Sequence, residues 1–422
     1  MSQSRFARLI PLLLVAGLVH LMLSLYGTVP SPVAPFNDVS LYGSWMQEML
    51  QSGNVITQIP GISRPFVYPF VAIVPMLIAF VLGGADVWQN TLSGWLPMIT
   101  VLNLAAIGAL TNWGKGAKST FTAAWFWIAF LALLGPISLG RIDSIASALA
   151  VFGLVALFWG RFQAAMVLFT VGAWVKIWPI AMGLALLIAE KRKNLVFSAA
   201  AFTVSITIGV GLLIGLVLIG GGSSEILGFV FTQGNRGIQI ESPIATFWIW
   251  FAKLGLFNAS IYFDQGLLTN QIAGDGVELT STLMSLAMIV AVAITALLGI
   301  RAFRAGADYN QIFTLVALTA TLDLIVFNKV GSPQFEGWLA VPVMAGLIFG
   351  LPRWRVPVIG ALLIAGLTNL VYPILYMDLM GLGWPSIVAL TLRNALLIAL
   401  LVWANLALQK LSDQRSNNLI LD

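Results

Sequence analysis

Apolar runs of about 20 residues, the length of a membrane-spanning helix, recur along most of this 422-residue chain. Only helices and closed barrels satisfy the backbone inside lipid, and these runs lack the strict alternation of a barrel strand. The pattern predicts an all-α polytopic integral membrane protein, a single domain over residues 1–422, with ten to thirteen helical membrane segments. The apolar segments lie near residues 9–27, 67–83, 91–112, 120–139, 143–160, 163–189, 195–220, 243–257, 280–300, 311–327, 335–351, 356–376 and 384–408.

Basic residues gather in the short connections between these segments, and the positive-inside rule assigns such connections to the cytoplasmic side. The net charge of +5 is therefore a topology signal and not an indication of a nucleic-acid partner. The clusters hold most of the 21 Lys and Arg residues and comprise Arg5/Arg8, Lys115/Lys118, Arg161, Lys191/Arg192/Lys193, Arg301/Arg304, Arg353/Arg355 and Lys410/Arg415.

If all these clusters are cytoplasmic, three of the apolar segments cannot be helices that cross the membrane in simple in-and-out alternation. The segment at 67–83 has Pro75 in its middle, and the segment at 243–257 is short and carries Lys253. We expect both to be short or re-entrant segments on the outer side, although a plain spanning helix remains the alternative for 67–83. We expect 163–189 to be a broken hairpin that turns at the sequence KIWP, residues 176–179, because broken helices are tolerated where they face protein or a cavity.

This topology brings five polar stretches to the outer face, which we predict to be the working surface. They are the first loop (28–66), SLGRIDS (138–144), KIWP (176–179), QGNRGIQIESP (233–243) and NKVGSPQFEGW (328–338). The chain has no Cys and a single His, His20, so disulfides, thiolate metal sites and a Ser-His-Asp triad are excluded. Chemistry here must use carboxylates, Lys, Arg, Tyr, amides and backbone, and we expect neither a metal nor a cofactor.

Seven basic residues remain for the outer side or the outer half of the membrane. They are Arg64, Arg141, Lys176, Arg236, Lys253, Lys329 and Arg393. Such cations are suited to binding a lipid phosphate at the headgroup level, since Arg binds phosphate oxygens bidentately and Lys acts as a point charge. The alternative is local pairing of Arg141 with Asp143, Arg236 with Glu241 and Lys329 with Glu336. For Arg393 we favour a buried pair with Asp323, with phosphate binding as the alternative, and we expect His20 to be a packed helix residue.

Asp38 lies in the first loop, in a stretch that predicts a short helix lying in the membrane interface. Its apolar positions recur at near-helical spacing and comprise Leu41, Trp45, Met49 and Leu50. Asn37 or Asp38 stands where an N-cap belongs, so the simplest role of Asp38 is to cap this helix. The alternative role is a general base that takes a proton from a sugar hydroxyl while cations stabilise a leaving lipid phosphate.

Five stretches, taken in order, resemble glycosyltransferase family eighty-seven of the GT-C superfamily. They are NDVSLYGSWMQEMLQSG (37–53), FVYPF (66–70), LGRIDSIASALAVFGLVALFWGR (139–161), AAMVLFTVGAWVKIWPIAM (164–182) and NKVGSPQFEGWLAVP (328–342). The resembled proteins are actinobacterial membrane enzymes that use polyprenyl-phosphate sugars. They include α-1,2-mannosyltransferases of phosphoinositol mannoside and lipomannan assembly and an arabinofuranosyltransferase.

The resemblance implies a GT-C fold in which Asp38 is the catalytic acidic residue of the first extracytoplasmic loop. Its most specific pieces are Asp38 with Tyr42, Lys176 with Pro179, and the Ser-Pro-Gln that ends at Gln334. Arg141 stands where many relatives have Gln, and this chain lacks the late His that some relatives place near the donor phosphate. Lys329 or Arg236 would then stand near the donor phosphate in place of that His. The residues expected around the donor are Arg236, Lys329, Lys176, Arg141, Tyr42, Gln334 and Glu241.

These observations predict an inverting glycosyltransferase of the plasma membrane whose active site faces the extracytoplasmic side. It would move a sugar, with mannose favoured, from a polyprenyl phosphate to a glycolipid or lipoglycan, and would act as a monomer among membrane lipids. An arabinofuranosyltransferase of the same fold is an alternative. A lipid-linked or small-solute transporter is a second, with the broken segments forming a midplane site. A non-catalytic partner of a glycan-assembly complex is a third.

Overall fold

The computed structural model describes residues 3–51, 59–84, 90–219, 225–230 and 236–418. Seven of its helices are long and apolar enough to cross a membrane, which is the character of a multi-pass membrane protein. These helices are α1 (Gln3–Thr28), α4 (Thr91–Leu110), α9 (Lys193–Ile219), α12 (Val277–Arg304), α13 (Tyr309–Val326), α15 (Arg355–Asn369, continued to Ile374 by a π-helical turn) and α17 (Trp384–Asn418). The predicted polytopic, largely helical class is confirmed.

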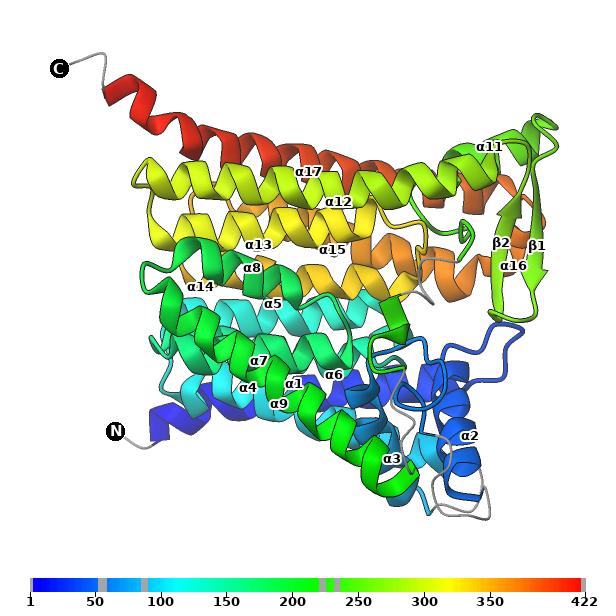
Figure 1. Cartoon of the computed structure of the whole chain (residues 1–422), viewed down its shortest axis with the longest axis horizontal. Coiled ribbons are helices and arrows are strands. Elements are labelled where there is room, and N and C mark those ends of the chain that lie inside the picture. The colour runs from blue at the N-terminus through cyan, green and yellow to red at the C-terminus, as the bar shows by residue number, and fades with distance from the viewer. Residues whose placement is uncertain (1–2, 52–58, 85–89, 220–224, 231–235, 419–422) are drawn as a thin grey trace.

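Shorter helices complete the bundle and cover one of its ends (Figure 1). Those within the bundle are α5 (Lys118–Leu134), α6 (Asp143–Phe158), α7 (Phe162–Val175), α8 (Ile180–Ala189) and α14 (Ala340–Ile348). Those toward its end are α2 (Asn37–Gln51), α3 (Ile73–Leu82), α11 (Ala245–Leu254) and α16 (Tyr376–Met380). An antiparallel hairpin of β1 (Ser260–Asp264) and β2 (Thr269–Ala273) lies at the same end, and an all-α prediction did not anticipate it.

The basic connections meet at one end of the bundle, which also holds the start of α1 and the end of α17 (Figure 1). We call this the basic end; its connections join α4 to α5, α6 to α7, α8 to α9, α12 to α13 and α14 to α15. The opposite end, called the polar end below, carries α2, the turn between α7 and α8, the β hairpin and the connection between α13 and α14. The described parts of the five polar stretches that the sequence assigned to a common face therefore share one, and residues 52–58 and 233–235 of these stretches lie outside the described residues.

The three anomalous segments are as short as expected. Helix α3 has ten residues, or about 15 Å, which is half the hydrocarbon core. It packs beside the start of α4 at the polar end, where the backbones of Ala79 and Gly94 meet closely. Helix α11 also has ten residues and lies at the polar end. Residues 163–189 form α7 and α8, which turn at Lys176, so the broken hairpin is confirmed.

Two apolar clusters hold these elements together. The larger fills the bundle, and His20 packs inside it between Thr100 and Asn103, as expected of a packed helix residue. The smaller lies under α11 and the β hairpin, where Ile238 and Ile240 pack with residues of α17. Residues 238–240 are therefore anchored to the bundle by buried side chains.

Candidate functional site

Helix α2 lies across the polar end of the bundle and places Asp38 in its first turn (Figure 1). The helix begins at Asn37, so both residues expected as N-cap are already helical, and that prediction is wrong by one or two positions. An acidic residue in the first turn is favoured by the helix dipole. The Asp38 carboxylate is one-third exposed (33%), and its Oδ2 lies 3.1 Å from Arg141 Nε. Asp38 is thus oriented by a cation while still open to solvent.

Arg141 is held from several sides. Its Nη1 donates hydrogen bonds to the carbonyls of Pro35 (2.7 Å) and Gly140 (3.0 Å), and its Nη2 donates to the Tyr372 hydroxyl (3.4 Å). Burial alone would lower the pKa of Arg141, but the Asp38 carboxylate outweighs it and the pKa is raised. The guanidinium therefore stays charged. Its ion-pair partner is Asp38, so the sequence alternative that paired it with its near neighbour Asp143 is wrong.

Tyr42 fixes α2 against the turn that carries Arg141. Its buried hydroxyl accepts a hydrogen bond from the Ile142 backbone N–H at 3.1 Å, and its ring meets Tyr68 edge-on with centroids 6.2 Å apart. Because Tyr42 stands one helical turn after Asp38, this bond sets the position of the carboxylate relative to Arg141. Tyr42 thus supports Asp38 rather than facing the solvent.

Lys176 ends α7 and is buried at the broken turn. Its Nζ lies 3.9 Å from Asp143 Oδ2 and above the rings of Tyr68 (4.7 Å to the centroid) and Phe335 (5.2 Å). The other oxygen of Asp143 accepts a hydrogen bond from Trp338 Nε1 at 2.7 Å. Burial lowers the pKa of Lys176, and the Asp143 carboxylate opposes that shift. Asp143 is a site residue that sequence reasoning assigned to the wrong partner.

Arg236 joins the same group of charges from the other half of the chain. Burial lowers its pKa, and the Asp38 carboxylate opposes the shift. The charges of Arg236 and Arg141 both act on Lys176, as does that of Asp38. We call Arg141, Lys176 and Arg236 the cation cluster. Of the predicted donor-binding residues, Arg141 thus contacts Asp38 directly, and Lys176 and Arg236 are near enough for their charges to interact with it.

An apolar cavity of about 300 Å³, called the lysine cavity below, adjoins the cation cluster. Lys176 and Lys329 both line it, and its remaining walls are largely apolar surfaces of α12, α13 and residues 229–230. Lys329 is buried, which lowers its pKa. Its expected pairing with Glu336 is wrong, since Glu336 pairs with Arg393. Two amines at the wall of an apolar cavity suit a ligand with a phosphate and a hydrocarbon chain.

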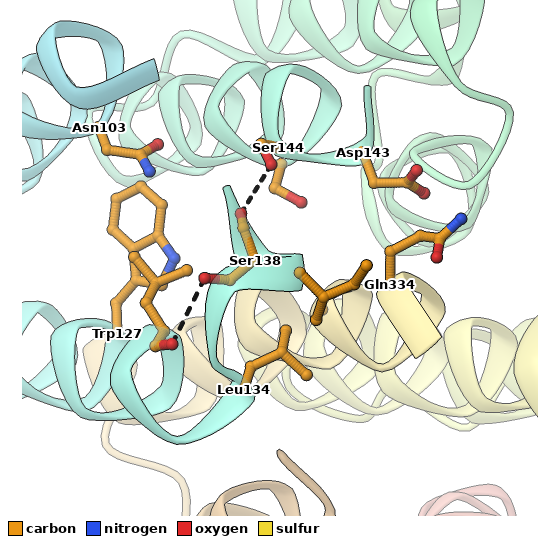
Figure 2. Close-up of a pocket in the computed structure, with 11 residues that line it drawn as sticks. Asn103, Trp127, Leu134, Ser138, Asp143, Ser144 and Gln334 are labelled. Carbon is orange, nitrogen blue, oxygen red and sulfur yellow. Dashed lines mark hydrogen bonds between the residues drawn. The ribbon is translucent and has the colours of Figure 1, made fainter. Parts of the chain in front are cut away.

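Gln334 lies behind Asp143 rather than beside Asp38. Figure 2 shows both residues at one end of a small pocket, with Asn103 and Trp127 at the other. The pocket holds about 20 Å³, room for a single water molecule. Gln334 Oε1 is buried there without a hydrogen-bond partner among the described residues. Gln334 and Asp143 thus line the same small pocket.

Arg393 forms a different contact from the one expected. Its fully buried guanidinium donates hydrogen bonds to the Glu241 carbonyl and to Asn394 Oδ1, and its Nη1 lies 3.5 Å from Glu336 Oε1. Asp323, the predicted partner, instead accepts a hydrogen bond from Thr295 Oγ1 at 2.6 Å. The prediction is wrong because Asp323 faces α12, whereas Arg393 faces the loops of the polar end.

Glu241 belongs to this buried group and not to the cation cluster. Its carboxylate accepts a hydrogen bond from Gln239 Nε2 at 3.1 Å, and burial raises its pKa to about 7 against the attraction of Arg393. Burial raises the pKa of Glu336 to about 7 in the same way. Arg236 and Glu241 therefore do not pair. The described contacts of Glu241 also give no support to its expected contact with the lipid-phosphate sugar donor. We call Arg393, Glu241 and Glu336 the buried charge triad.

Backbone hydrogen bonds join the loops that carry Arg236 and Lys329. The Gln239 N–H donates to the Lys329 carbonyl at 3.0 Å, and Gly331 lies against the Ser242 backbone, where a side chain would not fit. On the other side, Ile240 N–H donates to the Asn270 carbonyl of β2 at 3.2 Å. The two loops and the β hairpin form one braced unit.

The other outer cations lie apart from the cation cluster. Arg64 pairs with Glu48 at 2.9 Å, and Lys253 lies over the Trp384 ring at 5.0 Å. Across the described residues, no group of three or more His, Asp or Glu side chains could hold a metal ion. No protein-family model matches the chain, and no curated protein matches it. The function of the protein is therefore inferred from the geometry of the polar end.

Proposed function

We propose that this chain is a membrane glycosyltransferase that moves a sugar from a lipid phosphate to a hydroxyl group. One observation carries the proposal: a partly exposed carboxylate, Asp38, lies near two buried cations, Arg141 and Lys176, and a half-buried one, Arg236, beside an apolar cavity with two lysines. The cavity is suited to the hydrocarbon chain of the donor, and the cations to its phosphate. The order of motifs that resembles GT-C enzymes supports the same activity.

The arrangement suits a single displacement. Asp38 would accept the proton of the acceptor hydroxyl as its oxygen attacks the anomeric carbon. The bond from that carbon to the phosphate oxygen would break, and the polyprenyl phosphate would leave with both electrons of the bond. Lys176 and Arg236 would stabilise the charge on the leaving phosphate. One displacement inverts the anomeric configuration, and Arg141 would orient the Asp38 carboxylate.

The positive-inside rule assigns the basic end to the cytoplasm, so the polar end would face the extracytoplasmic side. The resemblance favours mannose as the sugar, with arabinofuranose as the alternative, and a glycolipid or lipoglycan as acceptor. The hydrocarbon chain of a lipid-linked donor fits the largely apolar lining of the lysine cavity.

The test is transfer of label by the purified protein from polyprenyl-phosphate mannose or polyprenyl-phosphate arabinose to a lipid extract. We expect one label to move with wild type, and Asp38→Asn to reduce the rate by at least about a hundredfold. Asp413→Asn, an exposed carboxylate at the basic end, is the matched control and should keep full activity. Thermal unfolding of each variant checks that it is folded.

Substantial transfer by Asp38→Asn would overturn the role of that residue. Failure of both labels to move would overturn the glycosyltransferase proposal. In that case, uptake of a lipid-linked sugar by proteoliposomes would favour the transporter alternative.

A further inference from the structure

A second pocket opens on α2, apart from the lysine cavity. It encloses about 290 Å³ and is lined by Trp45, Glu48, Arg64, Pro65, Phe66 and Val67. We call it the aromatic pocket. Neither the proposed chemistry at Asp38 nor the phosphate contacts use any of these side chains, so the pocket requires its own explanation.

The walls of the aromatic pocket combine flat rings with paired charges. Trp45 meets Phe66 edge-on, with ring centroids 5.2 Å apart and planes at 80°. Beside them, Arg64 Nη1 lies 2.9 Å from Glu48 Oε1, and both side chains reach solvent. A sugar ring presents apolar C–H faces and hydroxyl edges. The Trp45 ring can pack on such a face, while Arg64 donates and Glu48 accepts hydrogen bonds at the edge.

Charge distinguishes this pocket from the cation cluster. The carboxylate of Glu48 neutralises Arg64, so the aromatic pocket carries no net charge. The cation cluster, in contrast, has an excess of positive charge around Asp38. An anionic headgroup or a phosphate would therefore be drawn to the cation cluster. The aromatic pocket favours a neutral, hydroxyl-rich ligand.

The aromatic pocket is aligned with Asp38. Trp45 follows Asp38 by seven residues, which is two helical turns along the same face, or about 10 Å. That distance is comparable to the length of a disaccharide. Val67 lines both the aromatic pocket and the lysine cavity, so the two sites share a wall. An acceptor glycan could lie along α2 with one end at Asp38 and its next rings at Trp45.

We infer that the aromatic pocket binds a neutral sugar ring of an oligosaccharide acceptor, so that the enzyme extends a glycan already longer than one sugar. This inference rests on the proposed function for the identity of the reacting hydroxyl. A Trp45 that only anchored α2 in the membrane interface would have no preference for longer glycans. Glycan length is therefore the property to test.

The test measures binding without turnover, in the full-length Asp38→Asn protein in detergent. Mannose, mannobiose and mannotriose, with the matching arabinose series, are titrated by calorimetry. We expect the trisaccharide of one series to bind more tightly than its monosaccharide. Adding Trp45→Ala should weaken the trisaccharide about tenfold, whereas Trp45→Phe should retain most of the affinity. Trp113→Ala, an exposed Trp of the basic end, is the control and should change nothing.

Equal affinity for short and long sugars in both series, or an unchanged trisaccharide affinity in Trp45→Ala, would overturn the inference. The proposed function is tested separately by the transfer assay. Length-dependent binding that requires Trp45, in a protein that transfers no label, would support the pocket and reject the transferase. Transfer to single sugars as fast as to trisaccharides would reject the pocket alone.

Discussion

Replacing Arg393 with Met should destabilise the protein because it leaves two buried carboxylates without their cation. Met has a similar length and no charge, so the change removes the guanidinium with little loss of packing. The Glu336 carboxylate would lose a partner at 3.5 Å, and the Glu241 carbonyl would lose its donor. The loops that carry Arg236 and Lys329 would also lose one of their links to α17.

The size of the effect follows from burial. Arg393 has no exposed surface, and Glu241 and Glu336 are each 1% exposed. Removing one partner of a buried ion pair costs about 3 to 5 kcal/mol, because the remaining charge is left desolvated. Protonation of Glu336 would relieve part of this cost, and its pKa of about 7 makes protonation accessible. The loss should therefore be larger at pH 8 than at pH 6.

The assay is unfolding of the detergent-solubilised protein at both pH values, with Arg393→Met, Glu336→Gln and the double variant. We expect the double variant to recover part of the loss, because it no longer buries an unpaired charge at that position. The sum of the two single losses in the free energy of unfolding should then exceed the loss in the double variant by about 1 to 3 kcal/mol. Single losses that add within about 0.5 kcal/mol at both pH values would refute the buried charge triad as the reason for the Arg393 effect.

Three further predictions concern the same end of the protein. Burial raises the folded-state pKa of Glu241 and Glu336 from 4.5 to about 7, so their contribution to stability is complete below pH 4.5 and is lost as the pH rises to about 7. Thermal unfolding at several pH values should show this decline, and a Glu336→Gln profile parallel to wild type would contradict it. Tyr42→Phe leaves the Ile142 N–H buried without its acceptor and should cost about 1 to 3 kcal/mol in the free energy of unfolding; a neutral result would show that this bond does not hold α2. Lys176→Gln removes a proposed phosphate ligand and should raise the donor KM about tenfold with a smaller change in kcat, whereas an unchanged donor KM would place the lipid phosphate elsewhere.

The sequence predicts which loops share an end of the bundle because a membrane-spanning segment needs a minimum apolar length and basic residues favour the cytoplasmic side. Apolar length and the positions of Lys and Arg determined which connections share an end, and that sufficed to bring Asp38, Lys176 and Arg236 near one another. The broken turn at Lys176 was readable for the same reason, since a buried lysine followed by Pro179 interrupts an apolar run.

Side-chain pairing was not readable in this way. Arg141 pairs with Asp38 across about a hundred residues instead of with Asp143, two residues away. Arg393 contacts Glu336 and not Asp323, because the rotation of each helix about its axis decides which face meets the loops. The β hairpin had a signal in the alternation of SIYFD around a Gly-containing turn, which the pattern of long apolar runs does not reveal.

The braced unit of the polar end has a consequence for how such a site can change over generations. Its cross-links between residues 239 and 329 and between residues 240 and 270 use main-chain N–H and carbonyl groups, which nearly every amino acid provides. Side chains of these loops that are not buried can therefore be exchanged one at a time while the frame stays in place, whereas Gly331, Ile238 and Ile240 have no such freedom. The same frame could present different side chains to different lipids or sugars, so new specificities can arise here without a new fold.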